Sequence, residues 1–503
     1  MPDAIQDSRR GRDQAAQLHV RCLIRVPAWT SNRLPCRSGM AGGGERGVEG
    51  NLAPAADFRG DRNGPVSIAK PGDASAADVW RPILAGTMAD QALQAVDAIA
   101  ESITSIPSSP GDREPSLGRG EAGLALLYTW LDRAGRMPHA DVLARQCLDR
   151  AIEAVSTQAM NASLYGGFTG VAWAAELVDR LLDPDPEDRG EAVDDALLRI
   201  LSRDDRWSAS YDLIVGLSGL GVYALQRYPR PLASECLRRV VDRLQEFARR
   251  DEQGLYWWTP PAEIHEQWRK QYPSGRVDLG VAHGVAGVVG LLGGICGAGL
   301  EQATARPLLE GAVSWLLAHS IPTAHGPTFP VWVAPAFQPS PARCAWCYGD
   351  PGIAAALLLA ARGVGDAGWE QTAVALACRA AERPASETGV VNANFCHGAA
   401  GLAHLYNRMY QATGEPILGR AAVYWLERTL GFYRLARDAG GSWVLGNWDP
   451  GQRERWTWTG VELVEGAAGV ALVLLAAATS VEPTWDRMFL ASAPRPDPAT
   501  PGE

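Results

Sequence analysis

A short glycine phrase, G-x-x-G, recurs seven times along the chain, and most copies stand ahead of a run of apolar residues. The copies begin at Gly120, Gly167, Gly216, Gly284, Gly349, Gly398 and Gly466. A single copy would carry no weight, because glycine-rich turns and helix caps are common in a glycine-rich chain. Seven copies predict a repeated supersecondary unit, and repeats of this kind build arrays or closed rings.

The segments on either side of the glycines predict two kinds of helix. Residues 353–359 and 470–475, which follow two of the copies, are apolar on nearly every helical face, and a helix that is apolar all round must be buried all round. Residues 231–250 and 373–382, which lie between copies, are amphipathic and charged. We therefore predict an all-α fold, an α/α toroid (double barrel) of seven inner helices inside seven outer helices.

The predicted toroid occupies residues 76–485 as one domain. Residues 1–75 are rich in Gly, Arg, Asp and Pro without a sustained period, so we expect a disordered extension there, with Met40 and Met88 as alternative starts. Residues 486–503 are proline-rich and are expected to form a disordered tail. The connections before the fourth, fifth and seventh copies are long, and we expect them to overhang one end of the toroid.

Composition excludes several classes of protein. The chain of 503 residues has a net charge of −10 and no dense Lys/Arg block, which argues against nucleic acid as a partner. No apolar run approaches the roughly 18 residues of a membrane span, and the short patch near Leu23 lacks the form of a secretory signal. The nine cysteines are an odd number, so free thiols in a cytoplasmic protein are expected rather than a disulfide framework.

Polar residues of unusual type stand just ahead of the later glycine copies. They are Asp212 before the third copy, His283 before the fourth, Cys347 and Tyr348 before the fifth, Cys396 and His397 before the sixth, and Glu465 before the seventh. In a ring of like units, equivalent positions meet at one mouth, where helix N-termini favour thiolates and developing anions. Zinc binds Cys sulfur and His nitrogen, and a catalytic zinc keeps one position open. We therefore predict that Cys347, Cys396 and His397 hold one zinc ion.

Each candidate also has a simpler interpretation. A buried cysteine is often a small hydrophobic residue, which is the interpretation for Cys22, Cys36, Cys147, Cys236, Cys296 and Cys378. Cys344 and Cys347 form a C-x-x-C, typical of redox sites or half a zinc ribbon, but no second C-x-x-C and no βαβ pattern accompany it.

The remaining candidates have structural alternatives of their own. A lone histidine such as His283 is commonly structural, although its position in the repeat favours a catalytic role. Asp212 would otherwise cap a helix, and Arg343 would otherwise be an ordinary surface arginine. Tyr348 and Glu465 are expected at least to line the mouth.

From residue 76 to residue 477 the chain resembles the lanthionine synthetase C-like (LanC) family of lanthipeptide cyclases. Four phrases carry the resemblance, at residues 211–219, 282–284, 346–349 and 396–398. It implies an α/α toroid with one zinc ion on Cys347, Cys396 and His397. It also implies that His283 and Asp212 act in proton transfer or substrate positioning, and that Arg343 lies close to the metal. The long N-terminal extension departs from the family pattern.

The expected function is that of a zinc-dependent cyclase acting on a dehydrated precursor peptide. A peptide cysteine would take the open zinc position as a thiolate and add to the β-carbon of dehydroalanine or dehydrobutyrine, giving a (methyl)lanthionine thioether. His283 or a zinc-bound water would protonate the resulting enolate, with Arg343 and the helix ends stabilising it. Whether a lanthipeptide dehydratase binds alongside is left open.

Two alternatives remain open at this point. One is a LanC-like enzyme that adds glutathione to dehydroamino acids in proteins. The other is a non-catalytic scaffold that binds peptide or a partner synthase, in which zinc only stabilises the toroid. Consumption of glutathione would favour the first, and a metal site without an open position would favour the second.

Overall fold

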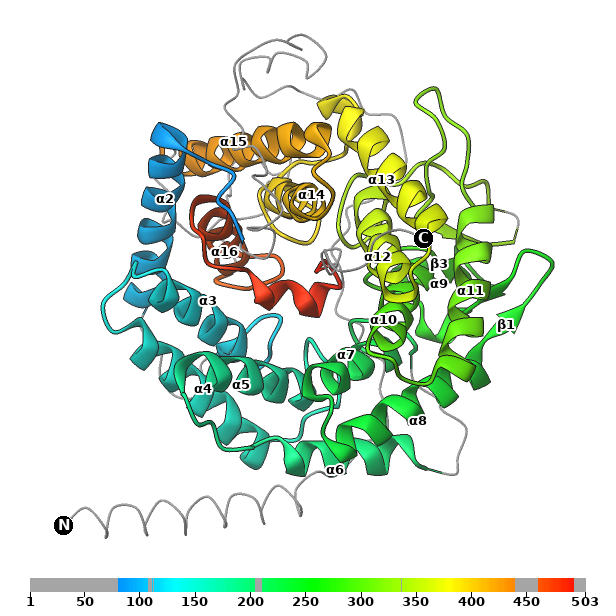
Figure 1. Ribbon diagram of the computed structural model, residues 1–503, viewed down its shortest axis with the longest axis horizontal. Coiled ribbons are helices and arrows are strands. Elements are labelled where there is room, and N and C mark those ends of the chain that lie inside the picture. Colours follow the sequence, from blue (N-terminus) through cyan, green and yellow to red (C-terminus); the bar gives the residue numbers. More distant parts are fainter. Residues whose placement is uncertain are drawn as a thin grey trace.

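The computed structural model describes residues 80–106, 111, 113–203, 210–335, 337–438 and 460–492. These residues contain fifteen α-helices, fourteen of which form two concentric rings (Figure 1). The inner ring consists of α3 (Glu121–Arg133), α5 (Phe168–Leu182), α7 (Leu217–Arg227), α10 (Val285–Gly297), α12 (Asp350–Val364), α14 (Ala399–Thr413) and α16 (Ala467–Ala478). The outer ring consists of α2 (Gly86–Ser105), α4 (Ala140–Thr157), α6 (Glu191–Leu201), α8 (Pro231–Phe247), α11 (Gln302–Ala318), α13 (Ala367–Glu382) and α15 (Pro416–Asp438). The predicted toroid of seven inner and seven outer helices is confirmed.

The ring closes where the end of the chain meets its beginning. Helix α16 packs against α2 and α3, so the last repeat adjoins the first. The indole Nε1 of Trp80 donates to the carbonyl of Ala476 at 2.8 Å, and the amides of Ile83 and Leu84 both donate to the carbonyl of Ala477. The segment before α2 therefore fastens the outer ring to the last inner helix.

Burial follows the hydrophobic pattern of each helix. In α16 every residue from Ala467 to Ala477 is buried, whereas α8 buries only one stripe of its surface. That stripe consists of Ala233, Cys236, Leu237, Val240, Val241 and Leu244. An all-apolar helix thus sits inside and an amphipathic helix covers it, as the sequence predicts.

The glycine phrase marks a close contact between each inner helix and the loop before it. The first glycine of each copy is the N-cap of the inner helix in all seven repeats. A Cβ atom on the second glycine would overlap the carbonyl oxygen six residues earlier, at 1.7 Å for Gly170 and Leu164 and at 1.8 Å for Gly401 and Phe395. Only glycine allows the loop to lie this close to the helix start.

Common capping residues mark the ends of α12 and α14 and the start of α13. Gly365 and Gly414 follow α12 and α14 in the left-handed conformation, both with φ of 72°, which is typical of a helix stop. The carboxylate of Asp366 accepts from the amide of Trp369 at 2.9 Å and so caps the start of α13. These short connections keep consecutive inner and outer helices antiparallel.

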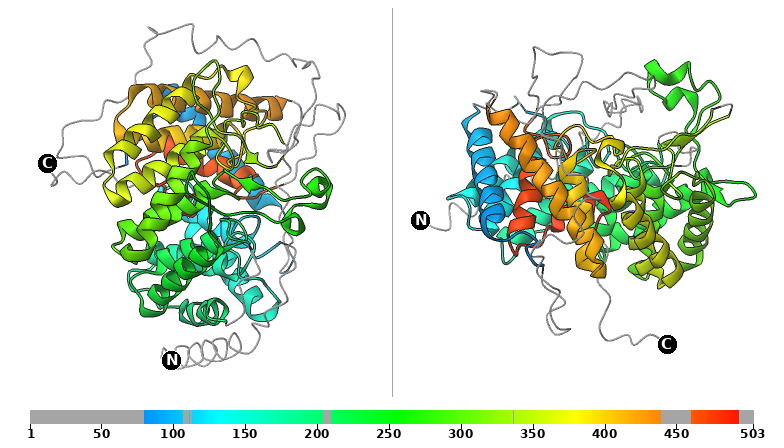
Figure 2. Two further views of the ribbon diagram at one scale, coloured as in Figure 1. Left: turned by 90° about the vertical axis from the view of Figure 1, so that its right-hand side faces the viewer. Right: turned by 90° about the horizontal axis from the view of Figure 1, so that it is seen from above.

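Two of the long connections overhang the toroid. They contain β1 (Arg249–Arg250), β2 (Leu255–Tyr256), η2 (Pro261–Glu263), α9 (Glu266–Arg269), β3 (Val277–Asp278) and β4 (Trp332–Val333). A separate short element, η3 (Ala385–Glu387), lies between α13 and α14. Strands β1 and β2 pair antiparallel. Strand β3 pairs antiparallel with β4, with Val277 opposite Val333. This second pair joins the connection before α10 to the connection before α12. Figure 2 shows the α9 region projecting beyond the rings. Most of the connection before the seventh copy lies outside the described residues.

The segment after α16 fills the centre of the ring. η4 (Thr484–Phe489) lies inside the inner helices (Figure 1), where Trp485, Met488 and Phe489 are buried. Residues 486–490, which the sequence pattern placed in a disordered tail, are therefore part of the core. The prolines that suggested a tail follow the apolar residues that fill the ring. Residues 1–79 and 493–503 lie outside the described residues.

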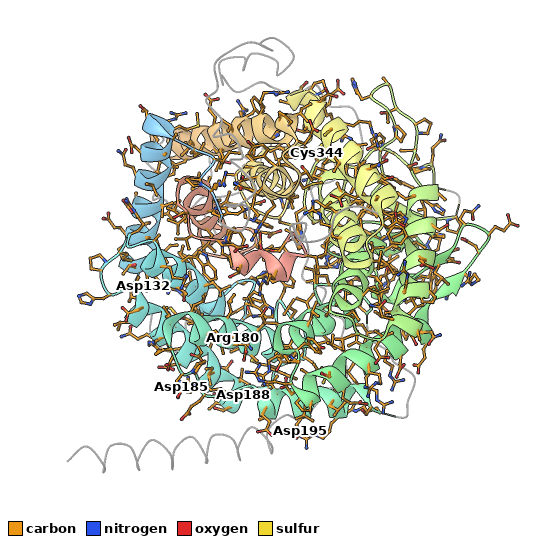
Figure 3. The ribbon with its side chains drawn as sticks, in the orientation of Figure 1. Asp132, Arg180, Asp185, Asp188, Asp195 and Cys344 are labelled. Atoms are coloured by element: carbon orange, nitrogen blue, oxygen red, sulfur yellow. The ribbon has the colours of Figure 1, made fainter. Side chains whose placement is uncertain are left out.

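A buried ionic cluster joins α5, α6 and α7. The guanidinium of Arg227 is buried and pairs with Glu176 at 2.7 Å, Asp194 at 2.6 Å and Asp188 at 2.7 Å. Figure 3 shows Asp188 toward the outer rim of the toroid, away from its centre. Such a cluster fixes which helices meet, because leaving the buried charge of Arg227, Glu176 or Asp194 unpaired would be costly. No helix among the described residues combines the length and apolar character needed to cross a membrane.

Candidate metal centre and proton relay

Backbone hydrogen bonds link the loops that precede the inner helices. The amide of Ala282 donates to the carbonyl of Cys347, Cys347 to Cys396, Cys396 to Val464 and Val464 to Gly118, at 3.0 to 3.3 Å. Each of these residues stands two positions before the first glycine of its own repeat. Equivalent positions therefore meet in space, and this is why residues far apart in sequence share one site.

Two cysteines and one histidine form a buried group on adjacent loops. One ligand atom from each of Cys347, Cys396 and His397 lies within 4.8 Å of the others, and all three residues are buried. A tetrahedral zinc with bonds of about 2.3 Å to sulfur and about 2.0 Å to nitrogen places its ligand atoms about 3.5–3.8 Å apart. Two thiols and an imidazole at this spacing fit zinc after a small contraction. No other group of this kind occurs among the described residues.

Asn394 fixes the position of His397. Its side-chain Oδ1 accepts from the amide of His397 at 3.0 Å, and its Nδ2 lies 3.4 Å from His397 Nε2. Below the loops, Trp346 donates from Nε1 to the carbonyl of Phe489 at 2.8 Å, and its ring lies edge-on to the Phe489 ring. The metal group thus rests on an aromatic layer that the C-terminal segment helps to build.

Cys344 lies outside this group. It is buried, its thiol is free, and burial raises its pKa to about 12 (Figure 3). Its amide donates to the carbonyl of Thr388 at 2.8 Å, so its backbone holds the start of the loop. A thiol with so high a pKa is a poor nucleophile, which disfavours the redox interpretation of the C-x-x-C.

His283 and Asp212 form a hydrogen-bonded pair. His283 Nδ1 lies 2.7 Å from Asp212 Oδ2, and both side chains are buried. The other carboxylate oxygen of Asp212 accepts from the amide of Val215 at 2.8 Å, which fixes the carboxylate. With the proton on Nδ1 donated to Asp212, the carboxylate fixes the tautomer and the orientation of the imidazole.

The overhanging connections support this pair through Tyr348. The ring of Tyr348 stacks on that of His283 with centroids 6.2 Å apart, and its hydroxyl donates to the buried Asp278 at 3.4 Å. Asp278 also accepts from Thr259 at 3.1 Å and pairs with Arg276 at 3.0 Å. Tyr348 therefore has a defined structural role beside the pair, which the sequence indicated only as lining the mouth.

A pocket opens where the loops converge. Its lining includes Arg119, His283, Cys396, Glu462 and Glu465, so one cysteine of the metal group and the histidine of the pair border the same space. Burial raises the pKa of Glu462, and the nearby Arg119 opposes that rise. The lining confirms the expected place of Glu465 at the mouth. Arg119 and Glu462 were missed, although Arg119 precedes the first copy just as His283 precedes the fourth.

Arg343 lies at the start of the loop that carries Cys347. It is half-buried, and its carbonyl oxygen would lie 1.9 Å from a Cβ atom on Gly349. Its own Cβ faces Gly389, where an added Cβ would come to 3.0 Å. The loop is therefore tightly packed at Arg343, while a role for its guanidinium beside the metal stays a prediction.

Comparison with known proteins settles the family. Residues 111–490, which contain every candidate site residue, match the lanthionine synthetase C-like protein family. The chain belongs to that family. No curated protein matches it. Among solved structures the LanC-like chain is similar to nisin cyclase, with a TM-score of 0.61 and 18% sequence identity over 79% of this chain and 96% of that one. At this identity the likeness shows a shared fold, the α/α toroid.

Proposed function

We propose that this protein is a zinc-dependent lanthipeptide cyclase. It would add cysteine thiolates of a dehydrated precursor peptide to dehydroalanine or dehydrobutyrine and so form (methyl)lanthionine rings. The observation that carries the proposal is that one pocket is lined both by Cys396, a member of the group with Cys347 and His397, and by His283, which is paired with Asp212. Membership of the LanC-like family supports it.

The metal group supplies the first requirement of this chemistry. A zinc ion held by Cys347, Cys396 and His397 would lower the pKa of a peptide thiol and keep it as a thiolate near neutral pH. The three residues are held before any substrate arrives, because each loop is hydrogen-bonded to its neighbour. Their burial keeps bulk water from competing with a peptide sulfur.

The histidine pair supplies the second requirement. When sulfur bonds to the β-carbon, the electrons of the carbon–carbon double bond move onto the α-carbon and its carbonyl as an enolate. A proton must then reach the α-carbon, and a protonated Nε2 of His283 can deliver it. Asp212 holds the ring by Nδ1 and stabilises its protonated form. The proton lost by the thiol balances the proton gained by carbon, so no other reactant is needed.

The fold adds electrostatic support. All seven inner helices begin at the loops around the pocket, so their N-terminal partial positive charges are directed toward it. Fixed dipoles of this kind stabilise a developing enolate without having to reorganise. Arg343 is proposed to contribute at the metal side.

The nature of the substrate indicates the partner enzyme and the cellular compartment that we propose. A dehydrated peptide arises only after a serine or threonine has lost water, so a lanthipeptide dehydratase is the proposed partner. We place both steps in the cytoplasm, where the precursor is made. Cysteine thiols of protein and peptide stay reduced there.

The decisive experiment compares two cysteine variants. Purified wild-type protein, Cys396→Ala and the matched control Cys344→Ala are incubated with a dehydrated precursor peptide. Thiol alkylation and mass spectrometry then count the free thiols, and zinc content is measured in parallel. We expect wild type and Cys344→Ala to consume thiols at unchanged peptide mass, and Cys396→Ala to lose both zinc and thiol consumption.

Other results would point elsewhere. Ring formation by metal-free Cys396→Ala would contradict the proposal. A mass gain that depends on added glutathione would favour the glutathione-adding alternative. Tight peptide binding with bound zinc and no change in the thiols of any peptide would favour the scaffold alternative.

A further inference from the structure

Arg119 holds a position that the predicted chemistry leaves unused. It stands directly before the first glycine of the first repeat, the position that His283 holds in the fourth repeat and His397 in the sixth. Its backbone is fixed, because the amide of Gly118 donates to the carbonyl of Tyr165 at 2.8 Å and the carbonyl of Gly118 accepts from Val464. Arg119 is therefore presented to the central pocket by the same loop geometry that presents the site residues.

The guanidinium of Arg119 differs from those of the structural arginines. Arg383 pairs with the buried Asp350 at 2.7 Å, and Arg408 pairs with the buried Asp486 at 2.9 Å. The Arg119 side chain is half-buried in the pocket lining, yet it makes no hydrogen bond or ion pair with another described residue. Its donors are thus available to a ligand, whereas those of the structural arginines are used.

Arg119 and His283 approach the pocket from opposite sides. Arg119 precedes α3 and His283 precedes α10, and Figure 1 shows these two helices on opposite sides of the ring. Cys396, which belongs to the metal group, also lines the pocket. A peptide residue in the pocket would therefore have a proton donor on one side and a cation on the other.

We propose that Arg119 binds the carbonyl oxygen of the dehydroamino acid and stabilises the enolate that forms there. This inference rests on the proposed cyclase function. A guanidinium presents several N–H donors in one plane and binds an oxygen anion more strongly than a neutral carbonyl. Arg119 would therefore contribute modestly to peptide binding and more strongly to the transition state. The nearby carboxyl of Glu462 moderates the positive charge of this side of the pocket.

The test uses Arg119→Gln, Arg119→Lys and the control Arg133→Gln. Arg133 is exposed at the far end of the same helix, α3. Two measurements are made on zinc-loaded protein: kcat and KM for a dehydrated precursor peptide, and the Kd of the same peptide with its cysteine replaced by alanine. Zinc content and Tm check that each variant is folded.

We expect Arg119→Gln to lower kcat about 100-fold, as loss of one oxyanion donor does, and to raise Kd by about 10-fold. Arg119→Lys should recover part of kcat, because it keeps the charge but not the planar fork. Arg133→Gln should match wild type in both measurements. An Arg119→Gln kcat within about threefold of wild type would overturn the proposal, even if Kd rises.

The Kd measurement tests the role of Arg119 separately from the proposed cyclase function. If wild-type protein binds peptides but cyclises none, the proposed function fails. In that case an unchanged Kd in Arg119→Gln would also overturn the role of Arg119 in holding the carbonyl. Where no peptide is turned over, a Kd raised about 10-fold would still support the role of Arg119 in holding the carbonyl.

Discussion

The hydrogen bond between Asp212 and His283 gives the sharpest test of the proposed proton relay. We consider Asp212→Asn, which keeps the size of the side chain but removes its charge. In the structure one carboxylate oxygen accepts from His283 Nδ1 at 2.7 Å and the other from the amide of Val215 at 2.8 Å. The asparagine oxygen would keep the bond to Val215, and its NH₂ group would then face Nδ1. His283 would be forced into the tautomer with the proton on Nε2.

The expected effect follows from the bond that is lost. A hydrogen bond to a charged group contributes about 1.5–3 kcal/mol, and here it would stabilise the protonated form of His283 that delivers the proton. At about 1.4 kcal/mol for each factor of ten, kcat should fall roughly 10- to 150-fold. The change of tautomer acts in the same direction, so the upper part of this range is expected. Zinc content should not change, because neither residue belongs to the metal group.

The assay is the rate of thiol consumption at saturating dehydrated peptide, with zinc content and Tm measured on the same samples. A matched control is Asp486→Asn, which alters a second buried His–Asp pair, with His404 at 2.6 Å, away from the pocket. That variant should lower Tm and leave kcat within about threefold of wild type. A kcat for Asp212→Asn that stays within threefold of wild type, with zinc bound, would refute the relay.

Two further predictions concern stability. Gly170→Ala should lower the free energy of unfolding by about 3 kcal/mol, because the added Cβ would lie 1.7 Å from the Leu164 carbonyl oxygen. Gly431→Ala should raise it by about 0.5–1 kcal/mol, because nothing lies within 4 Å of the added Cβ. Urea unfolding measures both changes. Burial lowers the pKa of His404, so as pH falls below about 6.5 the unfolded chain gains a proton that the native state lacks. Stability should then decrease by up to about 1.4 kcal/mol per pH unit, and His404→Gln should flatten this slope; an equally steep slope in that variant would contradict it.

The repeat pattern in the sequence predicted most of the fold. Seven G-x-x-G phrases ahead of apolar helices predicted both rings, and the structure supplies the physical reason at positions such as Gly170 and Gly401. A glycine repeat is readable from sequence because the contact it permits is local, between a helix start and the loop six residues before it. The same regularity predicted that Cys347, Cys396 and His397 would converge, which they do.

Other features could not be read from the pattern. Residues 486–490 were assigned to a tail because the prolines after them dominate the local composition, yet Met488 and Phe489 fill the ring centre. The indole N–H of Trp346 and the hydroxyl of Tyr165 both donate hydrogen bonds to backbone carbonyls of that segment. Donor and acceptor are 143 residues apart in the first bond and 323 residues apart in the second. No local periodicity encodes such partners.

The sequence by itself determined the number of repeats, the inner and outer character of the helices, and the candidate residues of the site. These properties depend on local sterics and on hydrophobic periodicity, which act over a few residues. Only the tertiary structure decided which loops are neighbours, that His283 pairs with Asp212, and that Arg119 faces the pocket without a described partner. Those relations depend on closure of the ring, which brings together backbone amides and carbonyls from distant parts of the chain.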